Sequence, residues 1–216
     1  MKVNKRRKNK MTIVQLISEY IRENAKVYLI LLLIFFIGLI MGILFINNSN
    51  ENQSIQISNY INNFINLIKN NNKISTRELL ISSASNNICI TIILCLLGST
   101  VIGIPLIYLV IGYKGFCIGY TISSVIATIG MQKGTLFIVS TMFLQNIIYI
   151  PAIITLAVSG IKLYKLIMKD RRKENIKVQI LKYIIFSLGI LIVLLVSSLV
   201  ETYISGNLSQ LVLKYV

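Results

Sequence analysis

The residues of this chain that could do chemistry are few, and the kinds that catalysis most often needs are missing or far apart. The sequence has no histidine, which excludes a Ser–His or Cys–His nucleophile pair and the H-E-x-x-H zinc motif. No apolar segment of the sequence contains two carboxylates, so an intramembrane aspartyl pair is also excluded. Cys89, Cys95 and Cys117 lie in apolar segments and are expected to behave as small buried hydrophobes. We therefore expect a protein that is not an enzyme and holds no cofactor or metal.

Two adjacent amides, Gln145 and Asn146, stand out in the middle of an apolar segment that also contains Pro151. An amide in hydrocarbon is costly unless it finds a hydrogen-bond partner, so both should face the interior of a helix bundle. A hydrogen-bond clamp between helices is the simpler interpretation, and a polar path or a docking site is the alternative. Glu201, at the outer edge of the last apolar segment, is expected to snorkel to the interface rather than to couple to an ion.

These residues must be positioned by a membrane bundle, as the composition indicates. Of 216 residues, 55% are hydrophobic and only 13% are charged, which is typical of a polytopic all-α membrane protein. Length and hydropathy predict about five transmembrane helices. Their expected ranges are 27–46, 87–111, 115–130, 134–160 and 183–200.

The chain is expected to divide into three parts. Residues 1–26 form a basic cytoplasmic segment, residues 27–203 form the five-span domain with an outer loop at 47–86, and residues 204–216 form an extracytoplasmic tail. The first apolar core is about 20 residues long and no small-residue cleavage site follows it, so we expect a retained span and not a signal peptide.

A glycine-rich apolar stretch, 98–121, contains a single charge, Lys114. A lysine beside glycines and between apolar segments favours a short cytoplasmic hairpin, so two spans are expected to meet at Lys114. Glycine and proline before it predict a kink in the second span, and the spacing of two glycines after it suits helix packing. The residues concerned are Gly103, Pro105, Gly115 and Gly119.

The net charge of +15 is explained by membrane orientation and not by nucleic-acid binding. With the N-terminus inside and five spans, the inner side receives eight Lys and Arg before the first span, Lys114, and eight between Lys162 and Lys182. Only five then remain for the outer side. The positive-inside rule therefore predicts a cytoplasmic N-terminus and an external C-terminus.

Two segments outside the expected spans have the periodicity of amphipathic helices. Residues 11–24 are expected to lie on the inner membrane surface, where the basic residues before them attract anionic lipid. In the outer loop an apolar face is the largest external apolar surface and hence a candidate docking site; the alternatives are packing on the bundle or on the outer leaflet. Its residues include Ile57, Ile61 and Phe64.

Gly38 and Gly42 in the first expected span form a small-xxx-small pair, which lets a second helix approach closely. Packing within the chain is the simpler interpretation. A dimer face, and with it a homo-oligomer, is the alternative.

Four short motifs together resemble one known family. They are G-I-P-L-I at 103–107, G-Y-K-G-F-x-I-G-Y-T at 112–121, Q-N-x-x-x-x-P at 145–151 and E-x-Y at Glu201–Tyr203. Their order and spacing resemble the stage II sporulation protein M family, over the second to fifth spans. The resemblance implies a multi-pass protein of the sporulation septum and the engulfing mother-cell membrane. It also implies two peptidoglycan-degrading partners, the sporulation proteins D and P.

Two functions follow as hypotheses. The first is a non-enzymatic scaffold of the engulfment machinery that localises and anchors those cell-wall hydrolases. The second is a permease-like subunit of a transporter, with Gln145, Asn146 and a short third span lining a pathway. The first is favoured because the expected spans carry no charge away from their ends and no inverted repeat.

Overall fold

A computed structural model describes residues 13–69, 76–100, 102–169 and 176–205, and these ranges contain helices and short connections without a strand. Five of the helical segments are long and apolar enough to cross a membrane: Ala25–Asn47, Thr76–Ser99, Gly103–Ile129, Met131–Met168 and Ile176–Ile204. The prediction of an all-α, polytopic membrane protein with five spans is confirmed.

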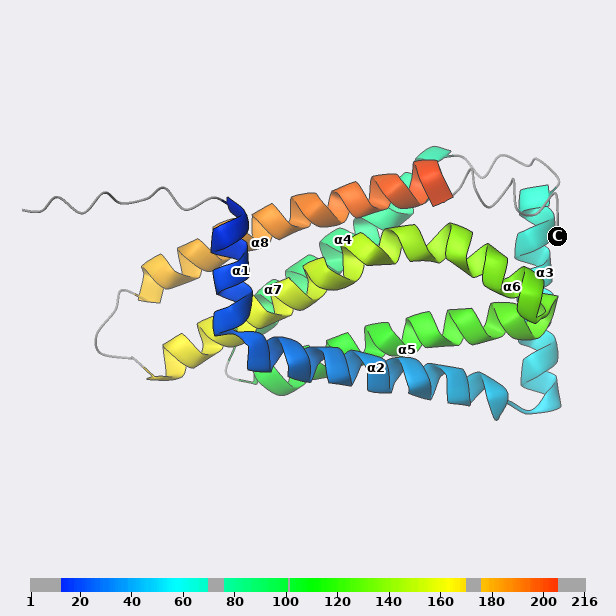
Figure 1. The fold of residues 1–216 in the computed structure, drawn as a ribbon, viewed down its shortest axis with the longest axis horizontal. Helices are drawn as coiled ribbons and strands as arrows, with labels where there is room; N and C mark the ends of the chain where they lie inside the picture. Colours follow the sequence, from blue (N-terminus) through cyan, green and yellow to red (C-terminus); the bar gives the residue numbers. More distant parts are fainter. Residues whose placement is uncertain (1–12, 70–75, 101, 170–175, 206–216) are drawn as a thin grey trace, which may run out of the picture.

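The spans run side by side, and two further helices lie across the ends of the bundle (Figure 1). Helix α1 (Ile13–Glu23) crosses the end where α2 (Ala25–Asn47) begins, and α3 (Glu51–Lys69) crosses the opposite end. The remaining elements are α4 (Thr76–Ser99), α5 (Gly103–Ile129), α6 (Met131–Ile138), α7 (Leu144–Lys169) and α8 (Ile176–Leu199). Two π-helical turns, η1 (Val139–Phe143) and η2 (Val200–Ser205), precede α7 and follow α8.

Helix α7 provides much of the core. Most of its residues from Ala152 to Leu163 are buried, because α4, α5 and α8 all pack on it. The cluster continues into the neighbouring helices with fully buried side chains such as Leu31, Ile107 and Leu194. The residues on the outer faces of the spans are large and apolar, as lipid contact requires.

The second and third spans meet at residues 100–102 and not at Lys114, so the predicted hairpin at Lys114 is wrong. Helix α4 ends at Ser99, Gly103 N–H donates to Thr100 O (3.2 Å), and α5 starts there. Pro105 falls in the first turn of α5, where a backbone N–H has no helical partner to lose, so it starts a helix instead of kinking one. Lys114 is the twelfth of the 27 residues of α5.

This correction removes a difficulty in the sequence-based topology. The third span was expected to be short, but α5 is 27 residues long, about 40 Å, which is enough to cross the hydrocarbon core with a tilt. The turn between α5 and α6 instead lies at Gly130, whose φ of 86° is a conformation that only glycine adopts easily.

The two ends of the bundle differ in their content of Lys and Arg, as the expected topology requires. Helix α1, the end of α7 and the start of α8 lie at one end of the bundle (Figure 1), with their lysines and arginines. Without Lys114, the positive-inside rule still predicts that this end faces the cytoplasm. We call it the inner end, and the end with α3 the outer end.

We expect a reporter fused at Arg172 to report a cytoplasmic location and one fused after Val216 to report an external location. The reason is the bias of Lys and Arg toward the inner end. Paired alkaline phosphatase and fluorescent-protein fusions measure this. A cytoplasmic signal at both sites would mean that the span Ile176–Ile204, which lies between them, does not cross.

Candidate functional site

A polar cluster joins three helices near the outer end of the bundle. Gln145 Nε2 donates a hydrogen bond to Glu201 Oε2 (2.7 Å), and Ser83 Oγ donates to the same oxygen. Ser197 Oγ donates to the backbone oxygen of Gln145 (3.3 Å). The carboxylate of Glu201 thus ties α4 and α7 to the end of α8. This carboxylate accepts hydrogen bonds between helices, and its expected place at the membrane interface stays a prediction.

The two π-helical turns determine where the side chains of this polar cluster lie. Glu201 lies in η2, Gln145 follows η1 by two residues, and the two turns contact each other. A π turn widens the helix by one residue and shifts the side chains that follow, and such turns are frequent at functional sites. The span that contains η1 and Pro151 is arched (Figure 1), and both features disturb the regular helical hydrogen bonds. The hydrophobic pattern carries no signal for a π turn.

A second polar contact, which sequence reasoning missed, lies deeper between α4 and α8. Asn87 is 2% exposed, and its Nδ2 donates to Ser198 Oγ (2.7 Å) and to Leu194 O (3.0 Å). One turn toward the inner end, Thr91 Oγ1 donates to Asn87 O (2.7 Å). Near the inner end Tyr183 Oη donates to Leu94 O (3.0 Å). An asparagine at the expected start of an apolar segment was the available signal.

The two amides singled out in the sequence have different surroundings. Gln145 makes the interhelical contact described above, whereas Asn146 is half-buried and has no hydrogen bond to any residue that the structure describes. Only the first therefore has the geometry of a clamp.

We expect Gln145→Leu to lower stability by about 1 kcal/mol and Asn146→Leu to have a much smaller effect, because interhelical hydrogen bonds in membranes have about that strength. Thermal unfolding of the purified protein in detergent measures both. Equal losses for the two variants would contradict the clamp. Normal stability with lost sporulation for Gln145→Leu would instead mark a functional residue.

Lys114 lies inside the bundle, in contact with α7. Its Nζ is 6.0 Å from the centroid of the Tyr149 ring, a cation–π contact at the limit of the usual range. Tyr149 is 5% exposed, and its hydroxyl is buried with no hydrogen-bond partner in the described part of the chain. The expectation that no charge lies away from the span ends is therefore wrong for Lys114.

Glycines join α2 and α5 along a close backbone contact. A Cβ added to Gly115 would overlap the carbonyl oxygen of Phe35, and one added to Gly119 would overlap that of Leu39. From the other side, a Cβ on Gly38 would overlap Gly112 O. Gly42 faces Phe116 O in the same way. The small-xxx-small pair of α2 thus packs within the chain, and its surface is not open to a dimer partner.

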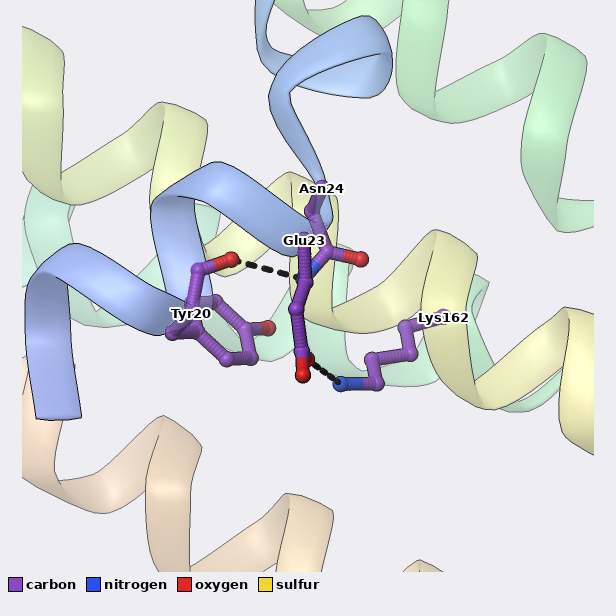
Figure 2. Close-up of polar contacts among 4 residues, drawn as sticks. All are labelled: Tyr20, Glu23, Asn24 and Lys162. Atoms are coloured by element: carbon purple, nitrogen blue, oxygen red, sulfur yellow. Dashed lines mark hydrogen bonds and ion pairs between the residues drawn. The ribbon is translucent and has the colours of Figure 1, made fainter.

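Helix α1 is fixed across the inner end by the contacts shown in Figure 2. Glu23 Oε2 lies 3.8 Å from Lys162 Nζ of α7, and that ammonium lies 4.9 Å from the centroid of the Tyr20 ring. Asn24 Nδ2 donates to Tyr20 O (2.8 Å), where the chain turns into α2. The Tyr20 ring also packs on Phe186 of α8, with centroids 5.7 Å apart.

Burial is the main reason why the pKa of Tyr20 is raised to about 12, and the nearby Tyr28 and Glu23 add to the shift. Tyr20 therefore stays neutral at physiological pH. Since the Glu23–Lys162 pair is largely exposed and such pairs add little stability, packing of Tyr20 attaches α1 more firmly than this pair does.

Helix α3 uses its apolar face to pack on the bundle. Ile65 is 6% exposed and clusters with Val125 of α5 and Phe137 of α6, with Ile61 packed beside them. Ile57, one turn earlier, is half-buried, and the side chain of Phe64 is outside the described residues. The candidate docking surface expected on this face is therefore occupied by the bundle. The side chains that point away include Ile55, 58% exposed, and Tyr60, 74% exposed.

A protein-family model described as Stage II sporulation protein M matches residues 31–206 of the chain. The match includes Lys114, the glycines of the α2–α5 contact and the Glu201 cluster, and it leaves out α1. No curated protein and no solved structure matches this chain.

Proposed function

Because the chain belongs to the stage II sporulation protein M family, we propose that it is a non-enzymatic membrane scaffold of the endospore engulfment machinery. In this role it anchors peptidoglycan-degrading proteins, the sporulation proteins D and P, in the sporulation septum and later in the engulfing mother-cell membrane. A scaffold needs a rigid body in the membrane and a surface on the side of the cell wall, and it needs no catalytic group.

The placement of α3 is the observation that carries the proposal. This helix lies across the outer end of the bundle, and its buried Ile65 and partly buried Ile61 attach it to α5 and α6. Its exposed side chains include Ile55 and Tyr60, which lie among Asn, Ser and Gln side chains on the two sides of the packed face, because five positions are about 140° of helix rotation. An exposed tyrosine and isoleucine on a fixed polar helix are the kind of residues that anchor protein interfaces. We therefore assign partner binding to these exposed side chains of α3, in place of the face with Ile57 and Ile61.

A permease-like subunit is the second candidate function. The position of Lys114 in the middle of α5 and the buried contact between Gln145 and Glu201 favour it, because ionisable residues inside spans often mark ion or substrate paths. In that case Glu201→Gln should abolish sporulation while hydrolase recovery stays at the wild-type level. A scaffold predicts that hydrolase recovery and sporulation change together.

The experiment that tests the scaffold is affinity capture of the tagged protein from the membranes of sporulating cells. We expect a cell-wall hydrolase to co-purify during engulfment and to be absent when an unrelated five-span protein with the same tag is captured. Capture of the intact protein without any wall hydrolase would overturn the proposal.

A further inference from the structure

The ammonium of Lys114 lies deep in the membrane. Lys114 is about 16 Å along α5 from Gly103, where that helix leaves the inner turn, which is close to the middle of a hydrocarbon core about 30 Å thick. Tyr149, which the ammonium faces, is about 20 Å along α7 from Lys162, the residue that pairs with α1 at the inner end. Neither interface is within reach of the side chain.

This charge has no counter-charge within the described part of the chain. The titratable groups that face it are the Tyr149 hydroxyl of α7, the Cys117 thiol on its own helix and the Cys89 thiol of α4, and none of them is a carboxylate. Glu201, the carboxylate of the polar cluster near the outer end, already accepts from Ser83 and Gln145. A span-buried ammonium and an unpartnered tyrosine hydroxyl therefore lie together.

Toward the outer end, Lys114 continues as a polar stripe along one face of α5. The stripe follows the spacing i, i+3, i+7, i+10 and i+14 and consists of Lys114, Cys117, Thr121, Ser124 and Thr128. Its hydroxyls donate to carbonyls of α5 itself, such as Thr121 Oγ1 to Cys117 O (2.9 Å). Lys114, Cys117, Thr121 and Thr128 are half-buried, whereas Ser124 is covered by the chain itself. Across from it Cys89 of α4 is exposed, and α4 and α5 diverge from their turn toward the outer end (Figure 1).

We propose that Lys114 pairs with a carboxylate carried at mid-depth by a transmembrane helix of a partner protein, which lies along α5 on the side of α4. The inference rests on the proposed function, because it specifies how an anchored partner is held within the membrane. Ionisable residues inside spans are usually paired, and no residue in the described ranges supplies this partner.

Two other occupants fit the observations less well. A lipid phosphate lies at the interface and would have to leave it to reach the middle of the hydrocarbon core. A second copy of this chain has Glu19, Glu23, Glu51, Glu78, Asp170 and Glu174 outside the spans or at their ends. Its Glu201 already has two donors. Neither source supplies an available mid-depth carboxylate.

The test uses the full-length protein in phosphatidylcholine vesicles, with Cys95→Ser so that Cys89 and Cys117 are the remaining thiols. The probe is a synthetic Leu/Ala helix of about 22 residues with one central Asp and a Cys one turn away, and the control probe has Asn in place of Asp. We expect the Asp probe to form disulfides with Cys89 or Cys117 about ten times more than the Asn probe, because the charge pair adds to helix association. Lys114→Arg should keep this preference and Lys114→Met should lose it.

Equal yields from the two probes, or a preference that persists in Lys114→Met, would overturn the inference. So would a preference that disappears when phosphatidylglycerol is added, because Lys114 would then be neutralised by lipid. If Lys114→Met does not fold, the disulfide yields of the Asp and Asn probes still test the inference. They are then compared on the Cys95→Ser protein that keeps Lys114 and on its Lys114→Arg variant. The outcome is separate from that of the proposed function: absence of a hydrolase in the capture experiment defeats the scaffold, whereas absence of a probe preference defeats only the charge pair.

Discussion

Gly115→Leu is expected to separate α2 from α5 and to remove most of the folded protein from the membrane. At this position even a Cβ would overlap the backbone oxygen of Phe35, and backbone cannot move aside as a flexible side chain can. Overpacking a core commonly costs 1–3 kcal/mol where side chains can adjust, so we expect a loss of about 3 kcal/mol or more here. The measurements are abundance in the membrane fraction and the thermal unfolding temperature in detergent.

Gly189→Leu is the matched control for this prediction. Gly189 also lies inside a span, but no atom lies within 4 Å of the Cβ that a substitution would add. Abundance close to the wild-type level is therefore expected, since a leucine there would face lipid. Equal abundance of the two variants would show that close approach of α2 and α5 is not required for folding.

Replacement of Ile55 and Tyr60 together by Asp is expected to release the wall hydrolases and leave the protein in the membrane. Both side chains are more than half exposed, so the change should not disturb the bundle. Exposed anchors of this kind commonly contribute 2 kcal/mol or more each to an interface, so recovery of the partner should fall by about tenfold or more. The measurement is hydrolase co-purification beside a membrane-fraction blot.

Ile61→Asp on the packed face of the same helix should behave in the reverse way. Ile61 packs on the cluster of Ile65, Val125 and Phe137, so a carboxylate there would be buried without a partner and the protein should lose abundance. Stable protein with full partner recovery after the change at Ile55 and Tyr60 would contradict the assignment of partner binding to these two side chains.

The sequence was sufficient for the features that depend on long apolar runs. Five spans, the amphipathic helices α1 and α3, and the packing role of the α2 and α5 glycines all follow from hydropathy and from small residues at helical spacing. Family membership was also predictable, because its motifs are short and local.

Lys114 shows why the boundaries between spans were not predictable in the same way. A lysine between glycines suits a loop and a close helix contact equally well, and only the position of α2 decides between them. The actual turn at 100–102 contains no charge, so neither hydropathy nor the positive-inside rule marks it.

The polar contacts depend on tertiary structure. Which face of α3 is covered depends on where α5 and α6 end, and the pairing of Gln145 with Glu201 depends on two π turns that leave no trace in the hydrophobic pattern. Asn87 pairs with Ser198, a residue 111 positions later in the chain, and no local periodicity relates the two.

Photocrosslinking at Tyr60 in sporulating cells tests most directly whether the outer end of this bundle holds cell-wall hydrolases. Benzoylphenylalanine replaces Tyr60 in one strain and lipid-facing Phe36 of α2, which is also exposed, in a second. Our account predicts a covalent adduct with a wall hydrolase from position 60 during engulfment and none from position 36, identified by mass spectrometry. Stable protein that gives no hydrolase adduct at position 60, or an equal yield at position 36, would contradict it.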